Sequence, residues 1–234
     1  MVVPQSSPLI SLSGLPDLTR EERWNLLLTV ARRIQMAIRR QNSSFAELGG
    51  LRNWPLFGAS VSLKRCDNSR LRCGMASGLQ TGELWNHLNQ AALLVATADP
   101  RFPKLRTDEL SRLRLEIWLF AHPEPVYAMG DSLVDSIDVR RHGLIVHREG
   151  NTGLLFPGMV RDAGWDAREA LTHVCTRARL PGNSWLERET QIEVFESTVI
   201  EGDMRKYLED DEDEFPEVPA AFLSRRSSAE HVGK

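Results

Sequence analysis

The chain has 234 residues, of which 41% are hydrophobic and 26% charged, a balance that suits one large domain or two closely packed lobes. No window holds the roughly 18 consecutive apolar residues of a membrane-spanning helix, and the N-terminus lacks the basic and long apolar regions of a secretory signal. The net charge is -3, but residues 201–214 hold eight acidic and two basic side chains and alone carry -6. We therefore expect no membrane association.

The cysteines indicate the compartment of the protein, and the arginines indicate whether it binds nucleic acid. Cys66, Cys73 and Cys175 are odd in number and widely spaced, which does not suggest a disulfide framework. A reducing compartment, the cytoplasm, is the simplest location. Arginines are numerous but mixed with acidic residues, and no basic stripe is interleaved with aromatic residues, so nucleic-acid binding is not expected.

The first half of the chain predicts two helices and a β-hairpin. Residues 1–18 suggest a flexible tail, and a helix over 19–41 follows because Thr19 and Glu22 fit a capping box. Residues 58–65 and 70–77 form the two strands of the hairpin, joined by the turn-forming sequence CDNS. Thr81 is expected to cap a second helix over about 82–97.

The second half predicts more strands than helices. The sequence indicates a helical turn at 107–110, a strand over 112–120, a hairpin around a Gly150–Gly153 turn, a helix over about 167–179 and a strand over 190–200. Asp166 and Glu169 form a second capping box. Paired strands with helices before and between them imply an α+β fold on an antiparallel or mixed sheet. Residues 201–234 are expected to be an acidic, disordered C-terminal tail.

Seven segments, in order, resemble the AMMECR family, whose bacterial and archaeal members are called AmmeMemoRadiSam system protein A: LRCGMA, ADPRFPKL, EL..L.LEIWL, RHGLIV, GLLFPGMV, GWD and C.RARLP..W. The resemblance covers about residues 61–199. It implies a single two-lobed α+β domain, here 19–200, with helices flanking the sheet. It also implies possible Memo-like and radical S-adenosylmethionine protein partners, but no established activity.

One segment departs from the family signature, which is usually written LRGCIG. Leu71 and Arg72 match, but cysteine and glycine are exchanged at Cys73 and Gly74. Since neighbouring side chains on a strand point to opposite faces, the exchange turns the sulfur to the other face unless a bulge compensates. A family activity that required this cysteine would then be lost.

Three residues are candidates for catalysis. Cys73 is a candidate nucleophile if nearby arginines favour its thiolate, or a small packing residue in the core. Glu116 lies mid-strand among apolar residues, where it is either a general base or the partner of an arginine. His142 precedes Gly143, where the backbone permits close approach of a ligand.

Four residues are candidates for ligand binding. Arg72 suits an anionic group, and its alternative role is an internal ion pair, for instance with Glu116. Gly74, Asp99 and Arg101 are expected to line the same cleft, although the ADPRFPKL segment also fits a purely structural corner. No cysteine and histidine cluster has zinc-site spacing and no phosphate-binding glycine loop is present, so the sequence predicts neither a metal nor a cofactor.

Two functions are consistent with these residues. One is an enzyme or accessory component that acts with Memo-like and radical S-adenosylmethionine proteins on a small or modified substrate. The other is a noncatalytic binding or scaffold module, which tolerates the exchanged cysteine. A weaker alternative is a regulator that contacts RNA. The sequence alone does not decide between them.

Overall fold

The computed structural model describes residues 14–41 and 48–208, and within these ranges the protein has the predicted α+β fold. The α-helices are α1 (Arg20–Arg39), α2 (Leu84–Thr97), α3 (Asp131–Asp135), α4 (Pro157–Ala163) and α5 (Ala167–Arg177). Short 3-10 helices are η1 (Gly49–Leu51), η2 (Thr107–Arg112), η3 (Ser184–Leu186) and η4 (Met204–Lys206). None of the helices in the described ranges is long and apolar enough to cross a bilayer.

Every strand pairing is antiparallel. The strands are β1 (Pro55–Leu56), β2 (Gly58–Arg65), β3 (Leu71–Ala76), β4 (Gly82–Glu83), β5 (Leu113–Phe120), β6 (Glu124–Val126), β7 (His142–Arg148), β8 (Asn151–Leu155) and β9 (Gln191–Asp203). Seven of them form one sheet in the order β3-β2-β5-β9-β7-β8, with β6 also paired to β9, while β1 and β4 form a separate pair.

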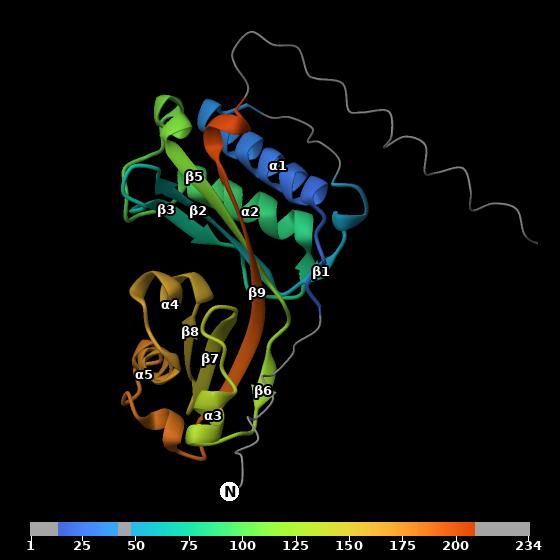
Figure 1. Cartoon of the computed structure of the whole chain (residues 1–234). Coiled ribbons are helices and arrows are strands. Elements are labelled where there is room, and N and C mark those ends of the chain that lie inside the picture. Colours follow the sequence, from blue (N-terminus) through green and yellow to red (C-terminus); the bar gives the residue numbers. More distant parts are fainter. Residues whose placement is uncertain (1–13, 42–47, 209–234) are drawn as a thin grey trace, which may run out of the picture.

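Strand β9 joins two lobes (Figure 1). Its C-terminal half pairs with β5 in the upper lobe, which also holds β2, β3, α1 and α2. Its N-terminal half pairs with β7 and β6 in the lower lobe, beside β8 and helices α3 to α5. A single 13-residue strand therefore passes from one hydrophobic core to the other.

The upper core lies between the sheet and helices α1 and α2. Helix α1 begins at the predicted cap, where the Thr19 side chain accepts a hydrogen bond from Glu22 N–H and the Glu22 carboxylate accepts one from Thr19 N–H. On β2, Val61 and Leu63 are fully buried and face these helices, while Ser62 between them faces the other side. The predicted alternation on this strand is confirmed.

Helix α2 differs from its prediction at the N-terminus. It begins at Leu84, two residues later than expected, and Thr81 does not cap it. The backbone of the preceding segment performs this role, because the Leu84 and Trp85 N–H groups donate to the carbonyls of Trp54 and Arg52. A side-chain cap is unnecessary where neighbouring backbone satisfies the free N–H groups of the first turn.

The lower core contains the predicted β7–β8 hairpin packed on α5. The turn is tighter than the Gly150–Gly153 turn predicted: only Glu149 and Gly150 connect the strands, both with positive φ (51° and 79°) as a type I′ turn requires. Gly153 instead lies within β8, where a Cβ atom would come within 2.3 Å of the Val174 carbonyl of α5. Helix α5 begins with the predicted Asp166–Glu169 capping box.

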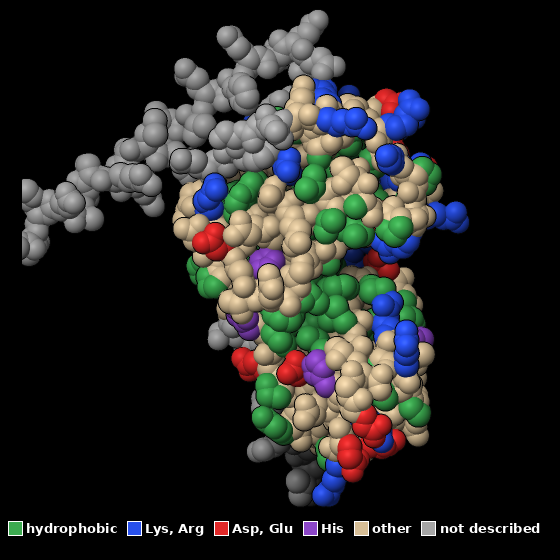
Figure 2. Space-filling view, turned by 180° about the vertical axis from the view of Figure 1, so that it is seen from behind, with side chains coloured by type: hydrophobic (Ala, Val, Ile, Leu, Met, Phe, Trp, Pro, Cys, Tyr) green, Lys and Arg blue, Asp and Glu red, His purple; other side chains and the backbone are tan. Residues whose placement is uncertain are grey.

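A third apolar cluster lies where the lobes meet, built from Trp118, Phe120, Ile145 and Phe195. The Phe120 and Phe195 rings meet edge to face with centroids 5.3 Å apart. From behind, Figure 2 shows apolar side chains gathered at the waist between the two lobes. Aromatic packing thus connects the lobes on this side.

The fold extends into both segments that were expected to be tails. Leu18 is buried near the start of α1, and β9 continues to Asp203, beyond the expected boundary at residue 200. Met204 and Tyr207 then pack into the upper core. The remainder of each expected tail, residues 1–13 and 209–234, lies outside the described residues.

Candidate functional site

The Arg72 side chain is buried and all of its contacts are internal. Its guanidinium donates to both carboxylate oxygens of Glu109, each at 2.8 Å, and to the carbonyls of Pro103 and Lys104 at 3.0 and 3.3 Å. The partner is therefore Glu109 of η2 and not Glu116, as one alternative had suggested. This ion pair fastens the segment that precedes η2 to strand β3.

A β-bulge places both Arg72 and Cys73 in buried positions. Cys73 is opposite Leu63 and Leu71 is opposite Lys64, so Arg72 is an extra residue on β3. The Cys73 side chain packs in the upper core. Burial raises the pKa of the Cys73 thiol to about 12 despite the attraction of Arg72, so the thiol is protonated at neutral pH.

Gly74, Asp99 and Arg101 form one structural unit at the outer edge of β3. The Gly74 N–H donates to the Asp99 carboxylate at 2.9 Å, and the Arg101 guanidinium donates to the Gly74 carbonyl and to Asp99. The hydrogen bond from Arg101 is the main cause that lowers the pKa of Asp99 to about 2. No further strand pairs with this edge among the described residues, so these contacts protect its free backbone groups.

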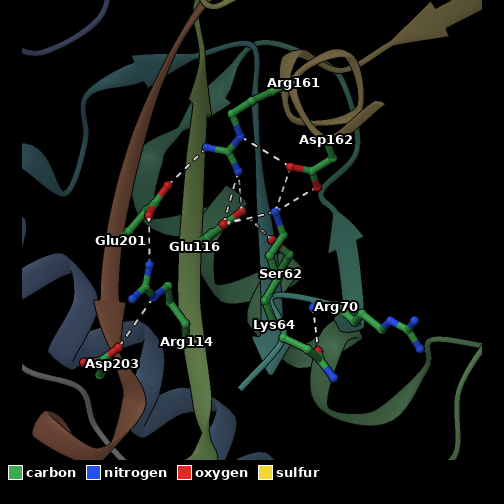
Figure 3. Close-up of polar contacts among 10 residues, drawn as sticks. Ser62, Lys64, Arg70, Arg114, Glu116, Arg161, Asp162, Glu201 and Asp203 are labelled. Carbon is green, nitrogen blue, oxygen red and sulfur yellow. Dashed lines mark hydrogen bonds and ion pairs between the residues drawn. The ribbon is translucent and has the colours of Figure 1, made fainter. Parts of the chain in front are cut away.

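Glu116 lies at the centre of a second charged group, drawn in Figure 3. Lys64 on β2 approaches the Glu116 carboxylate at 3.1 Å, and Arg161 on α4 donates to both of its oxygens at 3.0 and 3.1 Å. Lys64 also donates to Asp162 of α4 at 2.7 and 3.0 Å. We call Lys64, Glu116, Arg161 and Asp162 the interlobe cluster, because α4 belongs to the lower lobe and β2 and β5 to the upper one.

Helix α4 can approach the upper sheet closely because Gly158 faces Trp118. A Cβ atom at Gly158 would lie 3.2 Å from the Trp118 ring, closer than an ordinary contact, so a larger residue would require the ring or the helix to shift. One turn later, the Arg161 guanidinium lies over the same ring, 4.9 Å from its centroid. The indole and Glu116 together fix the position of this arginine.

The interlobe cluster lines a cavity of about 240 Å³. Arg114 and Glu201 also line it, as do Arg65 at the end of β2 and Cys66 and Ser69 of the β2–β3 turn. Glu201 accepts from Arg161 at 3.1 Å. The residues that line the cavity are therefore mostly charged or polar, in contrast to those of the apolar cores above and below it.

His142 lies apart from both groups, on β7 in the lower lobe. It is buried, and its Nδ1 atom accepts a hydrogen bond from the Asp138 N–H at 3.1 Å. Gly143 is close to the Phe195 ring and not to an open cavity, since a Cβ atom there would lie 2.0 Å from a ring carbon. The seven predicted residues thus occupy three places, and they do not form the single cleft expected from the sequence.

The sequence analysis did not single out Lys64, Arg161 or Asp162. The alternation along β2 placed Ser62 and Lys64 on one face, and Pro157 is a frequent first residue of a helix, so α4 and a polar strand face were detectable. Nothing local in the sequence connects the two. In the ranges 14–41 and 48–208, no group of three or more histidine, cysteine or acidic side chains is arranged to hold a metal ion.

Comparison with known proteins agrees with the fold and the motifs. The AMMECR1 family model matches residues 29–200. The chain belongs to the AMMECR1 family. Among its relatives, a protein of Nanoarchaeum equitans is 35% identical over 147 residues, covering 62% of this chain and 81% of its own length. A protein of Methanopyrus kandleri is 34% identical over 146 residues, covering 62% and 70%.

A solved structure of similar fold is the crystal structure of an uncharacterized protein from Pyrococcus horikoshii. It superimposes with a TM-score of 0.70 at 26% identity, covering 81% of this chain and 95% of the other. These similarities concern sequence and fold. Family membership therefore supports the fold, while a function has to be argued from the interlobe cluster itself.

Proposed function

We propose that this AMMECR1-family protein is a noncatalytic binding module whose interlobe cavity takes a small ligand with a carboxylate or phosphate group. The observation that carries the proposal is the unequal burial of the two acids bound by Lys64. The Glu116 side chain is 6% exposed, whereas that of Asp162 is 50% exposed. Glu116 is thus a fixed counterion, and Asp162 is an exchangeable one.

Asp162 marks where the ligand would bind. Its oxygens lie 2.7 and 3.0 Å from the Lys64 ammonium, at ordinary distances for a charge-assisted hydrogen bond. Arg161 is 3.4 Å from the same carboxylate. A ligand anion of similar geometry can replace Asp162 at both cations while Glu116 keeps them fixed, so the cluster is already arranged to receive it.

The surroundings of the three candidate catalytic residues favour a binding function over a catalytic one. Cys73 is buried with a raised thiol pKa, Glu116 is held between two cations, and His142 accepts a backbone hydrogen bond within the lower lobe. The enzymatic alternative requires a reacting group that is accessible from the cavity. Of the cavity-lining residues, only Cys66 has an exposed thiol, and burial together with Asp203 raises its pKa.

The partners and location predicted from the sequence belong to this proposal. A cytoplasmic binding module could deliver or retain a small acidic molecule for Memo-like and radical S-adenosylmethionine proteins. This link rests on family resemblance alone. Purification of the tagged protein with each candidate partner, in the presence and absence of an identified ligand, tests it directly.

A thermal-shift screen with carboxylate and phosphate metabolites tests the binding proposal. A ligand at about 100 times its Kd stabilises the native state by about 2.7 kcal/mol, which raises the Tm of a protein of this size by roughly 5–10 °C. The shift should disappear in Lys64→Met. It should increase in Asp162→Asn, because the internal competitor for Lys64 has lost its charge.

Two variants serve as controls. Asp131→Asn makes the same chemical change at an exposed pair with Arg168 in the lower lobe and should leave the ligand response unchanged. Arg72→Ala tests the predicted ligand-binding role of Arg72, Gly74, Asp99 and Arg101. A ligand shift that is lost in Arg72→Ala but kept in Lys64→Met would move the site to the β3 edge and refute the interlobe proposal.

A further inference from the structure

A second surface with several charged side chains lies on the outer edge of the upper lobe and is not part of the interlobe cluster. It is a groove of about 420 Å³ between the start of β3 and the segment that leads into η2. Its apolar surface comes from Leu71, Phe102 and Pro103, and Leu71 is unusually exposed for a leucine on a strand, at 37%. We call it the basic groove, because Arg65, Arg70 and Lys104 line it together with two paired arginines.

The basic groove has an excess of positive charge. Two of its arginines are neutralised internally, since Arg72 is bonded to Glu109 and Arg106 to Asp108. The side chains of Arg65, Arg70 and Lys104 are exposed, and no carboxylate among the described residues pairs with them. Figure 2 shows Lys and Arg side chains along this edge of the upper lobe. Three unmatched cations therefore surround an exposed apolar surface.

The described part of the chain ends at the same end of the upper sheet as this groove. Across the sheet, Asp203 of β9 pairs with Arg114 of β5, and Arg114 pairs with Lys64 of β2. Lys64 in turn pairs with Leu71, the first residue of β3. Three strand spacings of about 4.8 Å place the end of β9 roughly 14 Å from the start of β3. Helix η4 then packs against η2, whose first residues line the groove, and Figure 1 shows both at the upper end of the sheet.

The chain continues from this point with six consecutive acidic residues. Residues 209–214 have the sequence EDDEDE, and Phe215 and Pro216 follow them. Six extended residues span about 20 Å, which exceeds the distance across the end of the sheet. We propose that residues 209–214 bind the basic groove of their own chain, with carboxylates facing Arg65, Arg70 and Lys104 and the following phenylalanine facing Leu71 and Phe102.

A protein segment fits this groove better than a nucleic acid does. Phe102 is its only aromatic residue, and Arg101 lies 5.5 Å from the centroid of that ring. Single-stranded nucleic acids usually bind on several aromatic side chains that stack with successive bases. An acidic segment can place its carboxylates selectively against the three unmatched cations.

The contact can be tested by zero-length carbodiimide crosslinking of the full chain, which joins a lysine amine to a carboxylate that touches it. The chain has only four lysines, Lys64, Lys104, Lys206 and Lys234, so the crosslinked peptides are unambiguous by mass spectrometry. We expect a crosslink between Lys104 and residues 209–214. It should fall at least about tenfold in roughly 1 M salt, where the Debye length is about 3 Å.

Variants distinguish the groove from general charge attraction. Arg70→Ala removes one unmatched cation outside the interlobe cavity and should lower the Lys104 crosslink several-fold. Arg106→Ala removes an arginine already paired with Asp108 and should lower it less. Lys206, three residues before the start of the acidic run, should crosslink in every variant and so controls for reagent activity.

Three results would overturn the proposal. The first is a crosslink at Lys206 with none at Lys104. The second is a Lys104 crosslink found only between isotopically labelled and unlabelled copies, which would assign the groove to a second molecule. The third is an absent crosslink combined with oligonucleotide binding whose salt dependence is reduced in Arg70→Ala, which would make the groove a nucleic-acid surface.

Discussion

Two charged groups lie on neighbouring strands of the same sheet and differ in what they connect. At the β3 edge, Arg72 and the Asp99–Arg101 pair bond to backbone and to acids of the same lobe. In the interlobe cluster, Lys64 and Glu116 bond to a helix from the other lobe. The first group completes a sheet edge, whereas the second surrounds a cavity with one exchangeable acid.

The comparison shows that a buried charge is not by itself a sign of function. Buried ion pairs contribute little net stability because desolvation of both charges offsets their attraction. Arg72 and Glu116 are both buried, yet Arg72 forms four hydrogen bonds that fasten one loop. What distinguishes the interlobe cluster is a half-exposed acid beside a cavity.

The largest effect is expected from Glu116→Ala. This change leaves the Lys64 ammonium and the Arg161 guanidinium close together without their buried counterion, and loss of one partner of a buried pair costs about 3–5 kcal/mol. Urea unfolding should show this loss in the free energy of unfolding. Glu201→Ala, at the more exposed rim of the same cavity, is the matched control and should cost far less. Equal losses in the two variants would show that Glu116 contributes no more to stability than the more exposed Glu201.

A smaller loss is expected from Arg72→Ala. The variant leaves Glu109 without its partner, but the Glu109 side chain is 23% exposed and can be hydrated, so about 2 kcal/mol is expected. The same urea titration measures it. Ligand binding at the interlobe cavity should be unchanged. A loss as large as that of Glu116→Ala would mean that the two groups are not energetically different.

Asp99→Asn should destabilise the protein in a pH-dependent way. The folded-state pKa of Asp99 is about 2, below the ordinary value of 3.8, so its ionised form stabilises the folded protein above about pH 4 and that contribution is lost as the pH falls towards 2. The shift corresponds to about 2 kcal/mol at neutral pH. Unfolding of wild type and variant at about pH 7 and pH 3 should show the difference shrinking in acid. A constant difference would contradict this origin.

No reaction is expected at Cys73 in the native protein. Its side chain is 1% exposed and its pKa is raised to about 12, whereas Cys66 is exposed at the rim of the interlobe cavity. Iodoacetamide followed by mass spectrometry should therefore modify Cys66 and leave Cys73 intact until urea is added. Rapid modification of Cys73 in the folded protein would contradict this prediction and make Cys73 a candidate nucleophile again.

Local patterns in the sequence were sufficient for most elements of the fold. The capping boxes at Thr19 and Asp166 begin α1 and α5, and alternation along residues 58–65 predicted β2. A capping box depends on residues within one helical turn, and a strand face depends on every second residue. Both features can therefore be predicted from the sequence alone. The start of α2 could not be predicted in this way. Its first N–H groups, of Leu84 and Trp85, donate to backbone carbonyls of an earlier segment and not to a capping side chain.

The site depended on contacts that no local pattern specifies. Lys64 meets Asp162 across 98 positions, Arg161 meets Glu116 across 45, and Arg72 meets Glu109 across 37. A single-residue bulge at Arg72 decided that the Cys73 sulfur faces the core. The sequence by itself determined the family, the α+β class and the strand faces. Only the docking of α4 on the upper sheet decided which charges share a cavity, because ion-pair partners are chosen by distance in space and not along the chain.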